Sequence, residues 1–313
     1  MIQHTVNTPY MVGPVHFYTF ETNHGVIMFD TGPNTLEAIS YLNRHIDLKK
    51  LSFLFITHCH IDHYGLTYLI KQNSDARIFL SRYDYLKFKH YQTRFEKVTY
   101  MLEEEGFPKH ILNEINYYLE GMKRLAPFPE GEIIEENRDL LNQLNLDFLR
   151  CPGHSQSDIV YLFQNYAITG DVILRDVFQT PLLDLNLDDM KTRYNNYLAY
   201  IETIDKLISL SGYTILPGHR EYIDDVKQRI SIYLNKMLTR GVKIGKSLVE
   251  DSIYDIIVKI SNGKQLDSFT QYLKASEIFF IRDIFKNPEP LQKAINRHSL
   301  NIDLNKYVEE IYG

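Results

Sequence analysis

Short apolar runs separated by polar turns fill the first eighty positions of the chain, a pattern typical of strands. We predict strands at residues 15–20, 25–29, 53–56 and 76–80. Helices are predicted at residues 35–43, after a turn at 30–33, and at residues 66–71.

The pattern changes between residues 81 and 128, where Tyr, Phe, Lys, Arg and Glu dominate and Gly and Pro are scarce. This composition predicts two or three helices. Strands are expected again at 146–149, 159–163, 166–169 and 213–216, with a hairpin at Gln164-Asn165 and a helix at 187–210. From residue 222 to about residue 312 the pattern predicts helices, with breaks at 261–263 and 288–290.

Two strand-rich halves that each carry helices predict an α+β fold. We expect a four-layer αββα sandwich in which helices cover the outer faces of two packed sheets. Residues 1–225 would form this domain, with a helical insertion at about 81–130. Residues 226–313 would form a helical C-terminal extension.

Composition narrows the classes of partner. Hydrophobic residues make up 44% of the 313 positions, enough for a sizeable core. A net charge of −6 and a pI of about 6.1 give no overall attraction to nucleic acid, which is therefore a disfavoured partner. The chain shows neither a run of 18 apolar residues nor a signal-peptide pattern, so we expect no membrane contact. With only Cys59 and Cys151 as thiols, a cytoplasmic protein is the simplest expectation.

One cluster of polar residues carries most of the chemical information. His58, His60, Asp62 and His63 fall within six positions, directly after the predicted buried strand at 53–56. Imidazole and carboxylate are ligands that zinc and similar ions prefer. His58 and His60 are two positions apart, so in an extended loop their side chains point the same way, and Cys59 points the other way. We interpret the cluster as half of a two-metal site.

Three further residues repeat this arrangement. His154, Asp171 and His219 each have a glycine before them and each follow a predicted strand. Glycine lets the backbone turn sharply and approach a ligand closely. We therefore expect these side chains to converge with the first cluster at one edge of the packed sheets.

The pattern His-x-His-x-Asp-His, then Gly-His, Gly-Asp and Gly-His, resembles the metallo-β-lactamase superfamily over about residues 10 to 225. The resemblance implies that one divalent ion is held by His58, His60 and His154. It implies that a second ion is held by Asp62, His63 and His219, and that Asp171 bridges the two. Asp62 and Asp171 are the expected catalytic carboxylates, and Asp30 would support the site from behind the ligands, although it could also cap the following helix.

The same resemblance implies a dinuclear metal-dependent hydrolase in which a hydroxide shared by the two ions is the nucleophile. Members of the superfamily cleave thioesters, lactones, esters and phosphodiesters, and some bind iron for oxygen chemistry. We expect cleavage of an acyl-type bond of a small molecule, with a phosphodiesterase or ribonuclease as the alternative and an iron-dependent oxidoreductase as a third. Zinc is the first expectation, and the ligand set would also take iron or manganese.

The 81–130 insertion and the helical tail leave alternatives open. The insertion interleaves cations such as Lys87 and Arg94 with aromatic residues, which fits either a cover over the substrate or a helix pair with a solvated face. It is also the candidate surface for a homodimer. The tail is similar to that of hydroxyacylglutathione-hydrolase-like enzymes. Its recurring Lys and Arg residues would suit RNA, but the His-x-Thr element of RNA-processing relatives is missing from the sequence.

Overall fold

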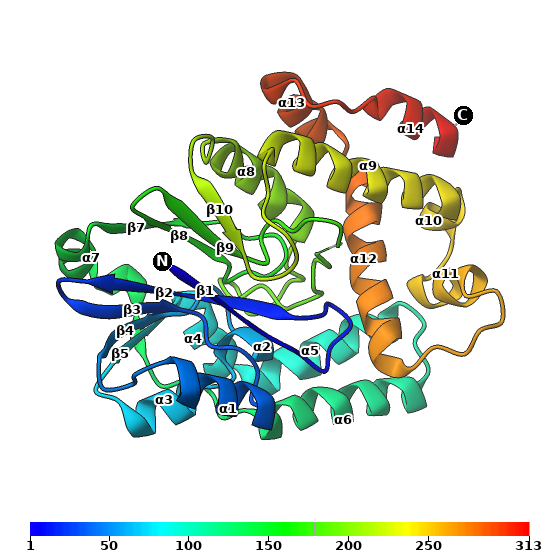
Figure 1. Cartoon of the computed structure of the whole chain (residues 1–313). Coiled ribbons are helices and arrows are strands. Elements are labelled where there is room, and N and C mark those ends of the chain that lie inside the picture. The colour runs from blue at the N-terminus through cyan, green and yellow to red at the C-terminus, as the bar shows by residue number, and fades with distance from the viewer. Residues whose placement is uncertain (178, 313) are drawn as a thin grey trace.

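Two sheets pack face to face at the centre of the molecule (Figure 1). The computed structural model describes residues 1–177 and 179–312, apart from the side chains of Met122 and Lys123. Within these residues the first sheet has the strand order β1-β2-β3-β4-β5-β6 and the second the order β10-β9-β8-β7. The strands are β1 (Ile2–Val6), β2 (Val15–Thr22), β3 (Gly25–Phe29), β4 (Leu51–Phe55), β5 (Arg77–Leu80), β6 (Glu132–Ile133), β7 (Leu146–Arg150), β8 (Ile159–Phe163), β9 (Tyr166–Gly170) and β10 (Thr214–Pro217).

Aromatic side chains fill the space between the sheets. Phe29 and Phe55 of the first sheet stack with ring centroids 5.6 Å apart, and both contact Tyr161 of the second sheet. All three are fully buried. The alternation of inward and outward side chains along each strand thus builds one apolar layer between the sheets.

Helices cover both outer faces, which completes the predicted four-layer α+β sandwich. The first sheet is covered by α1 (Leu36–His45) and α3 (Thr67–Asn73), and the second by α8 (Asn196–Ile208) (Figure 1). Thr35 caps α1 by accepting a hydrogen bond from the Ala38 N–H. The expected fold class is therefore confirmed.

Most of the remaining helices lie in the insertion and the tail. The insertion holds α4 (Arg82–Lys89), α5 (Tyr91–Glu104) and α6 (Lys109–Leu125). The tail holds α9 (Val226–Ile244), α10 (Ser247–Glu250), α11 (Ile253–Ile260), α12 (Ser268–Lys286), α13 (Glu289–His298) and α14 (Leu304–Tyr312). Outside these regions are α2 (Ile61–Tyr64), the 3₁₀ turn η1 (Ile134–Glu136) and α7 (Arg138–Leu144).

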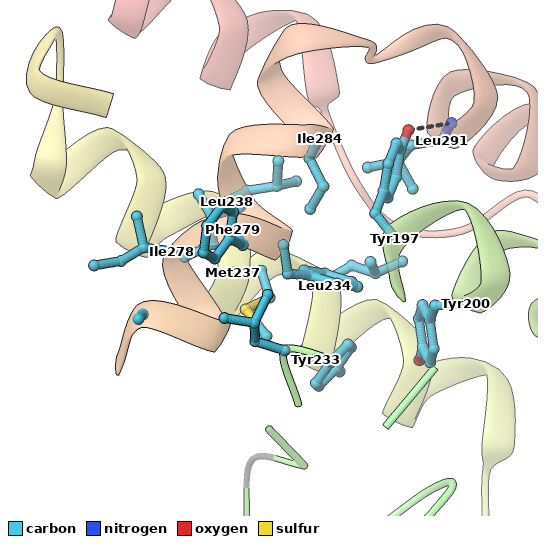
Figure 2. Close-up of a cluster of buried hydrophobic side chains, with 14 of the residues drawn as sticks. Tyr197, Tyr200, Tyr233, Leu234, Met237, Leu238, Ile278, Phe279, Ile284 and Leu291 are labelled. Carbon is cyan, nitrogen blue, oxygen red and sulfur yellow. Dashed lines mark hydrogen bonds between the residues drawn. The ribbon is translucent and has the colours of Figure 1, made fainter. Parts of the chain in front are cut away.

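The long helix α12 joins the tail to the rest of the molecule. It contacts α6 of the insertion, α8 and α9 (Figure 1). Figure 2 shows part of this core, to which α9 contributes Tyr233 and Met237 and α12 contributes Phe279. Arg282 of α12 also binds the carboxylate of Glu105, at the end of α5, at 2.9 Å and 3.0 Å. One apolar cluster therefore runs through the insertion, the second sheet and the tail, and the division at residue 225 stays a prediction.

The helix predicted at 187–210 is wrong in its first third, because α8 begins at Asn196. The Asn195 side chain accepts a hydrogen bond from the Leu198 N–H and so caps the helix there. Residues 187–195 instead form a loop. The Gln156 side chain holds the start of this loop by accepting from the Leu187 N–H.

Five short elements of the described chain are absent from the prediction: β1, β6, α2, η1 and α7. In β1 the inward positions are His4 and Val6, so a buried histidine interrupts the apolar alternation. Its Nε2 lies 2.8 Å from Thr19 Oγ1 on the paired strand. In the described part of the chain no helix has both the length and the apolarity needed to cross a bilayer.

Candidate metal centre

The candidate ligands all follow strands that point toward the same edge of the sandwich. Strands β3, β4 and β5 are mutually parallel, and so are β9 and β10. Strand β7 runs in the same direction as β9, because each is antiparallel to β8. The segments that follow β4, β7, β9 and β10 carry the seven side chains that the sequence singled out, with Asp62 and His63 on the short helix α2 after β4. Segments far apart in sequence are thereby brought together, as expected for the carboxyl ends of such strands.

The first group of side chains is a trio of imidazoles. His58 Nε2 lies 2.9 Å from His60 Nδ1, and His154 Nε2 lies 3.0 Å from the same atom. His58 is fully buried, whereas His60 and His154 are partly exposed. Three ring nitrogens that converge on one point without an intervening oxygen are arranged as ligands of one cation.

The second group combines a carboxylate with two imidazoles. His219 Nε2 is 3.3 Å from Asp62 Oδ2, and His63 Nε2 is 3.9 Å from Asp62 Oδ1. Asp171 lies between the groups: its Oδ1 is 3.4 Å from His63 Nε2, and its Oδ2 is 4.0 Å from His154 Nε2. The structure thus gathers all seven side chains, with Asp171 between the two groups.

The outer nitrogen of several histidines is tied to an oxygen. His154 Nδ1 donates to the Thr180 carbonyl and His219 Nδ1 to the Pro14 carbonyl, both at 2.7 Å. These bonds place the proton on Nδ1, so each Nε2 turns a lone pair toward the centre.

Three of the inward atoms are also buried and without hydrogen-bond partners among the described residues: His63 Nε2, His219 Nε2 and Asp171 Oδ1. A buried polar atom left unpaired costs free energy, and coordination to a cation would remove that cost. The residues present therefore fit a pair of divalent ions.

Asp30 holds one ligand and the loop of another. Its Oδ2 accepts from His63 Nδ1 at 2.9 Å and from Thr57 Oγ1 at 2.8 Å, and its Oδ1 accepts from the Thr57 N–H at 2.8 Å. Asp30 has a φ of +59°, a left-handed conformation that an aspartate can adopt. Because Thr35 caps α1, Asp30 is not the cap of that helix, and it sits behind the candidate ligands.

Electrostatics divide the site in two. Burial, helped by neighbouring histidines, holds the pKa of His58 well below 6.5, which keeps this imidazole neutral and able to act as a ligand. Burial also acts to lower the pKa of His63. There, however, Asp171, Asp62 and Asp30 outweigh burial and raise the pKa well above 6.5. The three carboxylates create a negative potential that stabilises positive charge at this point, whether a proton or a metal ion carries it.

Gly218 allows the ligand loops to approach closely. A Cβ at this position would lie 2.6 Å from both Asp171 Oδ1 and His63 Cε1. Any larger residue would therefore displace two candidate ligands.

A family model described as the metallo-beta-lactamase superfamily matches residues 10–219. The chain belongs to this superfamily. A probable metallo-hydrolase from Methanocaldococcus jannaschii is 26% identical over 202 residues, which cover 61% of this chain and 82% of that protein. A metallo-beta-lactamase fold-containing protein from Sulfurisphaera tokodaii is 25% identical over 173 residues, or 51% of this chain and 59% of that protein.

Solved structures extend the similarity in fold. A metallo-beta-lactamase family protein from Thermus thermophilus has a TM-score of 0.69 at 18% identity, covering 92% of this chain and 93% of that one. A beta-lactamase domain protein from Burkholderia ambifaria has a TM-score of 0.67 at 16% identity, covering 91% and 86%. The shared fold therefore reaches beyond the region that the metallo-beta-lactamase model matches.

Two buried residues beside this metallo-beta-lactamase site were not identified from the sequence. Asp84 and Lys87 of α4 lie next to the loops that carry His58, His60 and His154. The sequence places Lys87 in a row of cations on a charged helix, and nothing in that pattern marks it as buried. Cys59 is buried, and burial raises the pKa of its thiol well above 9.0, which favours the protonated thiol.

Proposed function

We propose that this chain is a dinuclear metal-dependent hydrolase that cleaves an acyl-type bond of a small molecule, such as a thioester, lactone or ester. The observation that carries the proposal is the convergence of seven ligand-type side chains, three of which bury an inward atom that lacks a hydrogen-bond partner among the described residues. Membership of the metallo-beta-lactamase superfamily and the similarity to a probable metallo-hydrolase support it.

Two divalent ions at such a site lower the pKa of a shared water toward about 7 and polarise the bond under attack. His58, His60 and His154 would hold one ion, and Asp62, His63 and His219 the other. Asp171 turns one oxygen toward each group and would bridge them. When His63 is a neutral ligand, Asp30 would hold its proton on Nδ1 and leave the Nε2 lone pair for the ion. Zinc is our first choice of metal, because imidazole and carboxylate ligands suit it.

The surroundings of the site favour an apolar acyl group over a phosphodiester. Tyr64, which follows His63, packs edge-on against Phe88 at 5.6 Å, and Phe88 contacts Phe128 at 4.3 Å. Aromatic side chains from the insertion therefore lie directly beside the ligand helix α2.

Several cations that could attract an anionic substrate are already paired within the chain. Arg94 binds Asp184 through two bonds, at 2.9 Å and 2.7 Å. In the tail Arg229 lies 3.7 Å from Asp176 and Arg240 pairs with Glu277 at 2.7 Å. These pairs reduce the positive surface available to RNA, which favours a small-molecule substrate.

The test combines metal analysis with a substrate panel. Protein loaded with zinc, iron or manganese would be assayed on a lactone, a thioester and bis(p-nitrophenyl) phosphate. We expect two ions per chain and turnover of an acyl substrate. Asp171→Asn should abolish turnover with little loss of folding, while Asp75→Asn, at an exposed aspartate, should match the wild type. Turnover of the phosphodiester alone would establish the alternative, and a protein that binds no ion would overturn the proposal.

A further inference from the structure

A group of buried polar residues lies behind His58, His60 and His154, and none of its members is a candidate ligand. Lys87 is 6% exposed, and the four others are between 0% and 4% exposed. These four are Asp84, Ser155, Ser157 and Asp158. Burying an ammonium group costs several kcal/mol unless hydrogen bonds and opposite charge compensate for the lost hydration. The burial of Lys87 therefore needs a physical explanation.

Lys87 reaches the loop that carries His154. Its Nζ donates to Ser155 Oγ and, at 2.8 Å, to Ser157 Oγ, and the two hydroxyls are 2.9 Å apart. Ser155 follows His154 directly, and its N–H donates to Asp158 at 2.6 Å. Hydrogen bonds from a charged donor are stronger than neutral ones and hold a loop more rigidly.

The same helix also holds the loop that carries the other two histidines. Asp84 lies one turn before Lys87 on α4, with its Oδ1 3.9 Å from Lys87 Nζ. That Oδ1 accepts from the Cys59 N–H at 3.0 Å, and Cys59 stands between His58 and His60. Helix α4, which is part of the insertion, is therefore hydrogen-bonded both to the loop that carries His58 and His60 and to the loop that carries His154.

We propose that Lys87 is a positioning residue for the three-histidine group, and that with Asp84 it sets the spacing between His154 and the His58–His60 loop. This inference rests on the proposed metal-binding function. Its consequence is specific: losing Lys87 should weaken the ion held by the three histidines and leave the ion held by Asp62, His63 and His219 largely unaffected.

Lys87→Met tests this, because methionine fills a similar volume without a charge or an N–H donor. Lys89→Met is the matched control, since Lys89 lies on the same helix and is exposed. The dissociation constants of the two ions would be measured by competition with a chromophoric chelator. The absorption spectrum of the cobalt-loaded protein would report on ligand geometry, and thermal unfolding of the metal-free protein on folding.

We expect Lys87→Met to weaken binding of the ion held by the three histidines by about 10- to 100-fold. This is the range seen when residues that support metal ligands are removed. The cobalt spectrum should change, and Lys89→Met should match the wild type in both measurements. Should Lys87→Met not fold, Ser155→Ala removes one of the two hydrogen bonds from Lys87 to this loop and should give a selective loss of the same kind.

Three results would overturn the inference. In the first, the dissociation constants of both ions for Lys87→Met, or for Ser155→Ala if that variant is used, lie within threefold of the wild-type values. Both ions could weaken equally, in step with a lower melting temperature of the metal-free protein, which would assign Lys87 a purely structural role. A wild type that binds no ion would overturn this inference together with the proposed function, whereas the first two results leave that function intact.

Discussion

Replacing Asp30 by Asn isolates the support behind the metal centre while keeping the size of the side chain. The Asp30 carboxylate accepts three hydrogen bonds, from the Thr57 N–H, from Thr57 Oγ1 and from His63 Nδ1, at 2.8 to 2.9 Å. An amide has one accepting oxygen and one donating nitrogen. In one orientation its NH₂ faces the Thr57 N–H. In the other it faces His63 Nδ1, and the conflict is relieved only if the His63 proton moves to Nε2.

That shift of the proton removes the lone pair which His63 would present to a metal ion. We expect Asp30→Asn to weaken metal binding by about 10- to 100-fold, which is about 1.4 to 2.7 kcal/mol of binding free energy. The unpaired donor should also lower the free energy of unfolding of the metal-free protein, by about 1 to 3 kcal/mol.

Two measurements separate these effects. Chelator competition gives the metal dissociation constants, and urea unfolding of the metal-free protein gives its stability. Asp47→Asn, at an exposed aspartate after α1, is the matched control and should change neither. The reasoning is refuted if Asp30→Asn binds both ions as tightly as the wild type, or if nitrogen NMR shows a changed His63 tautomer with unchanged affinity.

Three further changes test other parts of the structure. Gly218→Ala places a Cβ 2.6 Å from two candidate ligands and should lower metal content sharply. Gly121→Ala is the control, because a Cβ at that position meets nothing within 4 Å and should leave metal content unchanged. Equal metal content in the two variants would contradict this reasoning. Burial, and secondarily His45, lowers the pKa of His4 to about 4, so only the unfolded chain takes up this proton between pH 6.5 and 4. The free energy of unfolding should therefore fall by about 1 to 2 kcal/mol as the pH drops through this window, allowing for partial solvent screening, and His4→Gln should remove that part of the slope in urea titrations. Tyr197→Phe deletes a hydroxyl that accepts from the Leu291 N–H at 3.1 Å (Figure 2) and donates to the Asn287 carbonyl at 2.8 Å, and should cost about 1 to 3 kcal/mol of stability. A melting temperature equal to that of the exposed-site control Tyr85→Phe would refute this.

The candidate ligands could be found in the sequence because each follows an apolar strand closely. The strand at 51–55 precedes His58, and the strand at 166–170 precedes Asp171, so the order of short strands and polar residues locates the site at one edge. Packing of the two sheets follows from the same alternation of apolar residues. The fold class was therefore predictable to the level of its layers.

Other features depend on contacts between distant segments, which no local pattern reveals. His4 looks polar in sequence, yet pairing with Thr19 makes it an inward residue of β1. Lys87 looks like a surface cation, yet the serines that receive its hydrogen bonds lie some 70 positions further along the chain. The sequence of residues 187–195 predicts a helix, yet the Gln156 side chain holds this segment as a loop by accepting a hydrogen bond from the Leu187 N–H. In each case a single tertiary contact overrides the local preference.

The packing of α12 against α6 and α8 has a consequence for synthesis of the chain. The apolar faces of α6 and α8 emerge from the ribosome well before residues 268–286, which pack against them. During this interval they are exposed to water, and the nascent polypeptide depends on chaperones or on rapid completion to avoid aggregation. A truncated gene product that ends at residue 225 would keep every candidate ligand and still be expected to precipitate.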